Sequence, residues 1–171
     1  MRNGMTTTTI TIHKVSVDTI LALRHRILRE GLPLESACFE GDDAQTTLHF
    51  AAYAAGCGSP LVGCLSFMLN SFGHEPAWQL RGMAVDTPHQ CRGVGRQLIT
   101  HAEETLAREG RAALLWCNAR LPAVGFYQKL GWTVVSEVFE IPTAGPHVKM
   151  TKRLKKLDSV RETVEKSRDN G

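Results

Sequence analysis

Residues 86–96 read DTPHQCRGVGR, and this stretch decides the fold because it joins a predicted strand to a predicted helix. An apolar run at about 77–86 precedes it. After it, apolar residues recur at helical spacing, at Val94, Leu98, Ala102 and Leu106. Gly93 and Gly95 leave the main chain bare where it enters the helix, and the first N–H groups of a helix attract an anion. The stretch therefore predicts a strand, an anion-binding turn and a helix.

The turn differs from two common nucleotide-binding motifs. Arg96 and Gln97 follow Gly95, where a P-loop has Lys and then Ser or Thr. Leu98 stands where the third glycine of a dinucleotide-binding turn would be. Together with Arg92, the bare amides predict a pyrophosphate site without nucleotide hydrolysis. A solvated glycine turn that binds nothing is the alternative that this stretch alone leaves open.

Strands and helices alternate on both sides of this turn. We expect strands at 10–15, 46–55, 61–69, 77–86, 112–117, 132–139 and 147–152, and helices that end at Gly31, Gly110 and Gly131. Asp18 is the expected N-cap of the first helix, and Pro122 opens the third. The irregular segment 32–44 is placed to cover a ligand site. Since strands precede a strand–helix–strand unit, the order predicts a mixed α/β sheet with one parallel pair near its middle.

Composition and charge narrow the class of protein. The chain has 171 residues, of which 43% are hydrophobic and 22% charged, as in one globular domain. Residues 151–171 hold seven Lys or Arg and four Asp or Glu, which leaves 13 of each sign in the rest and places the whole net charge of +3 in this segment. A neutral body with 6% aromatic residues argues against nucleic-acid binding. No apolar run reaches the roughly 18 residues of a membrane span.

The cysteines, the histidines and the beginning of the chain bear on metal binding and on the compartment of the protein. The five cysteines include no C-x-x-C pair, and no histidine forms a metal-type doublet, so we expect reduced thiols and no bound metal. The beginning of the chain lacks the apolar segment of a secretory signal, which indicates a cytoplasmic protein. We expect a flexible N-terminus at 1–9, one domain at 10–153 and a charged tail at 154–171.

Two linked blocks resemble the motifs of the GNAT family of N-acetyltransferases. Residues 90–95, QCRGVG, match its Gln/Arg-x-x-Gly-x-Gly/Ala motif after a strand, here LRGMAVD at 80–86. Asn118-Ala119 and AVGFYQKLGW at 123–132 match the N-x-x-A-x-x-F-Y-x-x-x-G-F motif, with Trp for the last Phe. The resemblance covers about 10–153. The closing residues 141–150 further resemble a bacterial subgroup related to ElaA and YjcF.

The resemblance implies a mostly antiparallel sheet with a splayed central parallel pair and helices on both faces. It implies acetyl-CoA as acyl-donor substrate, a primary amine of a small molecule or peptide as acceptor, direct attack by the amine and no metal. Gly82 is placed to make the bulge that opens the sheet, where an N–H group can stabilise an oxyanion. The implied donor-site residues are Met83, Ala84, Val85, Gln90, Cys91, Arg92, Gly93, Val94, Gly95, Arg96, Asn118 and Phe126. Asn118 is alternatively a helix cap.

The catalytic residues follow from the same resemblance. Tyr127 occupies the position of the family's general acid, which protonates the departing thiolate; the alternative is a core tyrosine. Many relatives carry a glutamate base on the strand before the first motif, but residues 79–83 here contain no carboxylate. His147 is the candidate substitute because imidazole titrates near neutral pH; the alternative is a structural or surface histidine after the Gly145-Pro146 turn. Glu140, Glu30, His89 and a water chain are the other options.

Several assignments stay open at this stage. Cys91 is not expected to act as a nucleophile. Arg24, His25, Arg26 and Arg29 can reach acidic groups on an acceptor or form a solvated helix face. Asp42 and Asp43 can attract a cationic amine or be ordinary surface acids. A non-catalytic acyl-CoA-binding regulatory module is the alternative function, and a homodimer formed through the final strands is an expected assembly.

Overall fold

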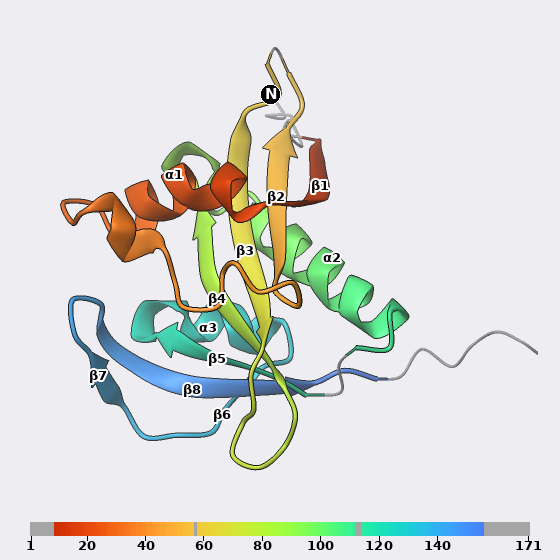
Figure 1. The fold of residues 1–171 in the computed structure, drawn as a ribbon, viewed down its shortest axis with the longest axis vertical. Coiled ribbons are helices and arrows are strands. Elements are labelled where there is room, and N and C mark those ends of the chain that lie inside the picture. The colour runs from red at the N-terminus through yellow and green to blue at the C-terminus, as the bar shows by residue number, and fades with distance from the viewer. Residues whose placement is uncertain (1–8, 57, 112–113, 156–171) are drawn as a thin grey trace, which may run out of the picture.

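The structure is a computed structural model that describes residues 9–56, 58–111 and 114–155. Its core is one sheet in the spatial order β1-β2-β3-β4-β5-β8-β6, with β7 paired to β8 (Figure 1). The strands are β1 (Ile10–Val15), β2 (Leu48–Ala54), β3 (Leu61–Leu69), β4 (Trp78–Val85), β5 (Leu114–Arg120), β6 (Thr133–Val134), β7 (Phe139–Ile141) and β8 (Gly145–Arg153). Of the neighbouring strands in this sheet, β4 and β5 run parallel and all other pairs run antiparallel. This mixed, mostly antiparallel sheet confirms the predicted fold class.

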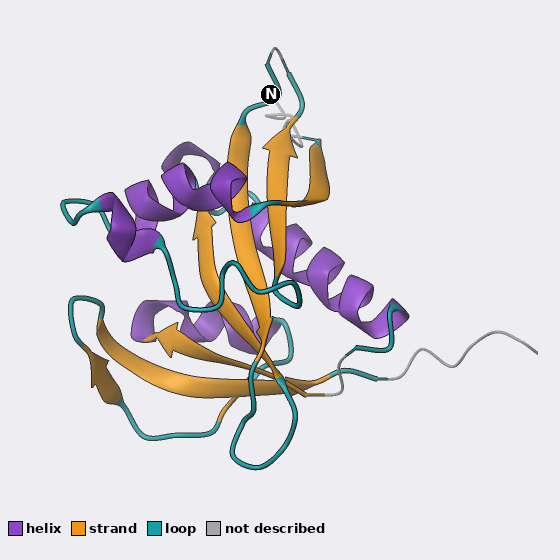
Figure 2. Cartoon of the chain, in the orientation of Figure 1, coloured by secondary structure: helices purple, strands orange, loops and turns teal. Residues whose placement is uncertain are grey.

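Helices cover both faces of the sheet (Figure 2). The helices are α1 (Val17–Leu28), α2 (Val94–Arg108) and α3 (Val124–Lys129), with short 3-10 turns η1 (Leu34–Ala37), η2 (Thr87–His89) and η3 (Leu121–Ala123). Successive strand residues point to opposite faces. Accordingly Ala51 packs in one apolar cluster with Ile20 of α1, whereas Phe50 packs in the other with Leu98 of α2. The middle of the sheet is thus covered by apolar side chains on both faces.

The sheet opens between β4 and β5. Their pairing is confined to Trp78–Leu80 against Leu115–Cys117. Beyond Leu80, two residues of β4, Gly82 and Met83, stand opposite the single Leu65 of β3. Gly82 has φ +59°, a conformation that glycine adopts readily. The predicted bulge and splay are both present, and they expose the carboxyl-terminal half of β4.

The expected strand at 132–139 is wrong, because β6 and β7 are separate. Val135 still donates its N–H to the carbonyl of Lys149, at 2.9 Å. At the next position the Lys149 N–H donates instead to the hydroxyl of Ser136, at 2.7 Å. A side-chain oxygen therefore replaces a main-chain carbonyl in the ladder, and the chain leaves the sheet until Phe139.

Two predicted boundaries also shift. Helix α1 begins at Val17 with Ser16 as N-cap, so Asp18 lies in the first turn rather than at the cap. Strand β5 continues past Cys117 to Arg120, because its residues keep pairing with β8 as far as His147. Residues 112–113, where this strand was expected to begin, lie outside the described residues, as do 1–8 and most of the expected tail, 156–171. No helix in the described part of the chain is long and apolar enough to cross a membrane.

Candidate functional site

The turn between β4 and α2 presents bare main-chain amides. Cys91 and Gly93 both have positive φ, +57° and +82°, and Gly93 is the N-cap of α2. No side chain caps this helix end. The first N–H groups of a helix have no partner within the helix, and alternating left-handed residues turn neighbouring N–H groups toward one point. The turn is therefore suited to bind an anion such as a phosphate.

A cavity of about 520 Å³ lies against this turn. It is lined by most of the predicted donor-site residues, namely Met83, Ala84, Val85, Gln90, Cys91, Gly93, Gly95, Arg96 and Phe126. Three predicted residues are not in the lining. Arg92 is exposed, the side chain of Val94 is buried in the core beside Gly63, and Asn118 lines another cavity described below. Ile27, His89 and Ala123 also line this donor cavity.

Gly95 allows the helix to approach the rest of this donor cavity. A Cβ atom at Gly95 would lie 2.9 Å from the Met83 Cε atom and 3.3 Å from the Phe126 ring. Real Cβ atoms do not make contacts as short as the first of these. The absence of a side chain here therefore keeps open the space between α2, β4 and α3.

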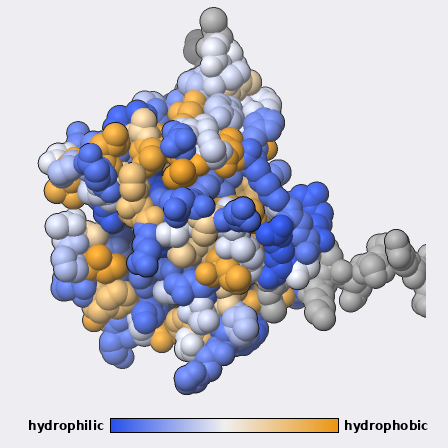
Figure 3. Space-filling model, viewed as in Figure 1, coloured by the Kyte–Doolittle hydropathy of each residue, from blue (hydrophilic) through white to orange (hydrophobic). Residues whose placement is uncertain are grey.

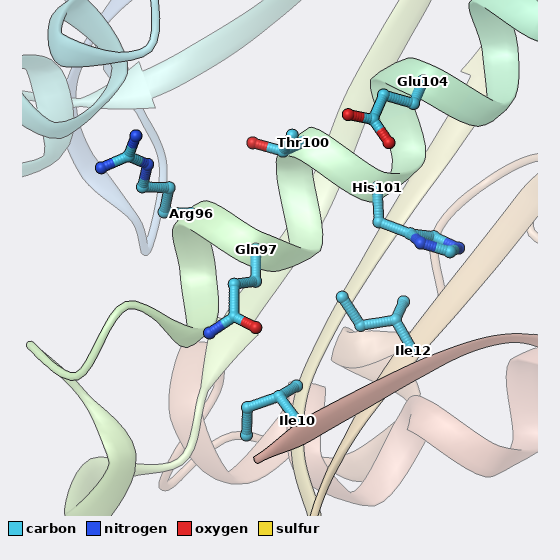
Figure 4. Close-up of a pocket in the computed structure, with 7 residues that line it drawn as sticks. All are labelled: Ile10, Ile12, Arg96, Gln97, Thr100, His101 and Glu104. Carbon is cyan, nitrogen blue, oxygen red and sulfur yellow. The ribbon is translucent and has the colours of Figure 1, made fainter. Parts of the chain in front are cut away.

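A separate groove of about 410 Å³ runs between α2 and β1 (Figure 4). In this view Gln97 and His101 point toward Ile10 and Ile12 of β1, whereas Arg96 leaves the helix on the other side. That direction agrees with the place of Arg96 in the lining of the donor cavity. Arg96, which lines both this groove and the donor cavity, is thus a cation that a ligand in the donor cavity can reach.

A second cavity, of about 400 Å³, occupies the splay between β4 and β5. Residues from three other segments also line it: Leu28 and Arg29 at the end of α1, Phe39 in the irregular loop, and Ile141, Ala144 and His147 around β7 and β8. Figure 3 shows hydrophilic residues on the surface between the α1–η1 segment and the β7–β8 hairpin. We call this space the acceptor cavity.

Tyr127 lies where the two cavities meet. Together with Met83 and Ala123 it lines both of them. Its ring packs edge-on against Phe126 and Trp132, while its hydroxyl donates only to the weak acceptor Met83 Sδ, at 3.6 Å. Burial, and next the neighbouring Cys117, raise the pKa of Tyr127 well above its usual value. The phenol therefore keeps its proton while its hydroxyl faces the junction.

His147 lines the acceptor cavity and is only 4% exposed. Its Nδ1 atom lies 2.7 Å from the carbonyl oxygen of Gly145. A carbonyl only accepts, so Nδ1 donates, and in the neutral ring Nε2 then carries the free lone pair. The alternative bases Glu30 and Glu140 are exposed and lie outside the lining of either cavity. His89 lines the donor cavity instead.

Asn118 lies in β5, on the wall of the acceptor cavity rather than of the donor cavity. Its Oδ1 atom is buried and has no hydrogen-bond partner in the part of the chain that the structure describes. Neither the 3-10 turn η3 nor α3 has a side-chain cap, so the capping alternative is wrong. A buried acceptor without a donor is costly, and it suits a ligand N–H group.

The charged run at the end of α1 divides into separate roles. Arg24 is fully buried and pairs with Asp42, which removes both from the cavity surface. Arg26 pairs with Asp86 at 2.9 Å. His25 contacts the carbonyl of Leu32. Of the four residues, Arg29 lines the acceptor cavity.

Sequence reasoning missed Arg120, Arg81 and Phe39, which line the acceptor cavity. A signal for Arg120 existed: it stands two residues after Asn118, and alternate residues of a strand share a face. The expected end of the strand at Cys117 concealed this. Nothing in the pattern of residues 32–44 distinguishes Phe39 as a cavity residue. No group of three or more His, Cys, Asp or Glu residues suited to a metal ion occurs among the described residues.

Comparison with known proteins identifies relatives of this chain. Residues 18–132 match the family model described as "Acetyltransferase (GNAT) family". The chain is 36% identical over 147 residues to an uncharacterized N-acetyltransferase, YitI, of Bacillus subtilis, and this alignment covers 84% of the chain and 96% of the relative.

Solved structures share the fold at lower sequence identity. Escherichia coli ElaA superposes with a TM-score of 0.64 at 21% identity, over 85% of this chain and 100% of that one. An aminoglycoside 6'-N-acetyltransferase complexed with coenzyme A superposes with a TM-score of 0.64 at 18% identity, over 84% of this chain and 96% of that one. Both likenesses concern the arrangement of helices and strands described above.

Proposed function

The chain belongs to the acetyltransferase (GNAT) family, and we propose that it transfers an acetyl group from acetyl-CoA to a primary amine of a small molecule or peptide. The observation that carries this proposal is the junction of two cavities at Tyr127. One cavity begins at bare helix amides, and the other holds His147. A thioester bound at the junction would face an amine in the second cavity. A module that only binds acyl-CoA would not need this second cavity.

The donor cavity fits the chemistry of coenzyme A. The amides at 93–95 and Arg96 would hold the pyrophosphate, because a helix N-terminus and a guanidinium both favour an anion. The exposed half of β4 at Met83–Val85 would pair with the peptide-like pantetheine arm as an added strand. Beyond the junction, the unpartnered Oδ1 of Asn118 in the acceptor cavity would accept an N–H from the thioester end of the same arm. Phe126 and the space beside Gly95 would receive its apolar atoms.

The proposed chemistry assigns one proton to each side of the junction. His147 Nε2 takes the proton that the amine loses, and the amine nitrogen bonds to the acetyl carbon. An N–H group at the Gly82–Met83 bulge stabilises the oxygen that becomes negative. As the carbon–sulfur bond breaks, the Tyr127 hydroxyl donates its proton to the leaving thiolate. The products are the acetylated amine and coenzyme A, and solvent returns the proton from the imidazole to the phenol.

The first test is binding of acetyl-CoA by calorimetry, where we expect one site per chain. Gly95→Leu is expected to weaken this binding at least tenfold, because the new side chain fills the space between Met83 and Phe126. Gly125→Leu is the matched control, since a Cβ at Gly125 meets nothing within 4 Å. Undetectable binding to the unmodified protein, or equal affinities in the two variants, would contradict the proposed donor site.

The pH dependence of kcat provides a second test. A general acid must be protonated, and the pKa of Tyr127 is raised, so the alkaline fall of kcat is expected above pH 10, the usual value for a phenol being about 10. An alkaline fall of kcat below pH 10 would exclude Tyr127 as the general acid.

A further inference from the structure

The acceptor cavity is lined by cations without a balancing acid. Its cations are Arg29, Arg81 and Arg120, and no Asp or Glu lines it in the described part of the chain. A cavity built for a polycationic amine would require the opposite charge, because each ammonium group would meet a guanidinium. The charge of this cavity therefore carries information about the acceptor.

None of these three arginines has a carboxylate within ion-pair distance among the described residues. Arg29 donates to the carbonyls of Ser36 and Leu28, at 3.3 and 3.2 Å, and Arg120 donates to the same Leu28 carbonyl at 3.4 Å. The shared acceptor brings the two guanidinium groups together. Burial, and next the charge of Arg120, lower the pKa of Arg29. Arg81 differs, because burial lowers its pKa while the nearby charges of Asp42 and Glu40 raise it.

The aromatic ring of Phe39 holds part of this cluster in place. The guanidinium carbons of Arg29 and Arg81 lie 5.6 and 5.0 Å from its centroid. Contact with a ring restrains a guanidinium, and the Nη2 group of Arg29 has no hydrogen-bond partner among the described residues. The Nε and Nη1 groups of Arg120 likewise have none, so the two side chains together can donate to the oxygens of a carboxylate or phosphate. The cluster is thus preorganised for an oxyanion.

The cluster also lies close to the proposed base. Arg120 of β5 stands directly opposite His147 of β8 in the antiparallel register. Side chains at such positions are on the same face, with Cβ atoms about 5 Å apart. An amine beside His147 and an oxyanion beside Arg120 would therefore fit within one small molecule.

We propose that the acceptor is a small amine that carries an oxyanion close to its amino group, and that Arg29 and Arg120 bind this oxyanion. This inference rests on the proposed acetyltransferase function and names the substrate class. A free amino acid supplies the oxyanion as a carboxylate, and a phosphorylated amino sugar supplies it as a phosphate. Polyamines, aminoglycosides and amidated amino acids lack it.

Matched pairs of acceptors test the proposal through release of the coenzyme A thiol. Leucine and lysine are each compared with their α-amides, and glucosamine 6-phosphate with glucosamine; spermidine serves as the polycation. With regard to the carboxylate or phosphate alone, we call the member of a pair that carries it anionic and the other member neutral. The anionic member is expected to have a kcat/KM at least tenfold above its neutral counterpart. The pair that shows this preference identifies carboxylate or phosphate as the source. Equal or better turnover of the neutral members or of spermidine would overturn the proposal.

Variants assign the preference to the arginines. Arg120→Gln and Arg29→Gln are each expected to lower the ratio of anionic to neutral turnover at least tenfold, and Arg120→Lys should restore part of it. Arg108→Gln on the exposed surface of α2 is the matched control and should leave the ratio unchanged. A ratio that is the same in both cavity variants and in the unmodified protein would overturn the assignment.

Product binding separates this inference from the proposed function. In the presence of coenzyme A, the N-acetylated amino acids and N-acetylglucosamine 6-phosphate are titrated by calorimetry against their uncharged counterparts, which requires no turnover. At least tenfold tighter binding of an anionic product, lost in Arg120→Gln, would support the oxyanion site even if every amine proved inactive. Equal binding within all pairs would overturn it. Failure to bind coenzyme A itself would instead contradict the proposed function.

Discussion

Replacing Tyr127 by phenylalanine is expected to lower kcat about 100-fold while the affinity for acetyl-CoA stays within twofold. Loss of a general acid typically costs a factor of about 100 to 10,000 in rate. The ring remains in its contacts with Phe126 and Trp132, so the shape of the junction is kept. Among the described residues the hydroxyl donates to Met83 Sδ, a weak acceptor, at 3.6 Å. Its removal should therefore change the free energy of unfolding little. Steady-state kinetics with a saturating donor and calorimetry measure the two quantities.

Tyr53→Phe is the matched control for this prediction. Tyr53 is the other tyrosine of the chain, and it lies on β2 outside both cavities. Its variant is expected to retain full turnover. A Tyr127→Phe enzyme with more than a third of the original kcat would remove the phenol from the mechanism. A parallel loss of acetyl-CoA affinity would indicate that the hydroxyl binds the donor rather than protonating the thiolate.

The donor side of the site could be predicted because local sequence determines it. Gly93 and Gly95 stand between an apolar run and a helical stripe, and a strand–glycine–helix sequence places bare amides at one point. The bulge at Gly82 was likewise predictable, since a glycine inside a strand commonly marks one. These features depend on residues close together in the chain.

The acceptor side could not be predicted to the same extent, because it depends on contacts between distant segments. Arg29, Phe39 and Arg120 come from three separate segments and meet across the splay. The break after Val134 depends on the Ser136 hydroxyl reaching Lys149 in another strand. Which arginine near the end of α1 becomes buried also follows from tertiary contacts: Arg24 meets Asp42, Ser66 and the carbonyl of Ala37. The spacing of apolar residues along the chain contains no information about such contacts between distant segments.

The ion pair of Arg24 with Asp42 is the structural support of the acceptor side. Arg24 is fully buried, donates to the Ser66 hydroxyl at 2.7 Å and lies over the Phe39 ring at 4.5 Å. A Cβ atom on Gly82 would lie only 2.6 Å from its Nε atom, so the guanidinium packs directly on the bulge of β4. Asp42 also accepts the N–H of Phe39, at 2.8 Å. One carboxylate thus holds both the loop and the buried cation.

Asp42→Asn is therefore expected to lower the free energy of unfolding by about 3 kcal/mol, because removing one partner leaves an uncompensated buried charge. This is more than a 100-fold change in the folding equilibrium, and urea denaturation measures it. The exposed neighbour Asp43 provides the control, since Asp43→Asn should change stability by less than about 0.5 kcal/mol. In Arg24→Met/Asp42→Leu no charge is left unpaired, so much of the stability should return. If Asp42→Asn lowered the free energy of unfolding by no more than Asp43→Asn does, Arg24 would not depend on Asp42 for its charge balance.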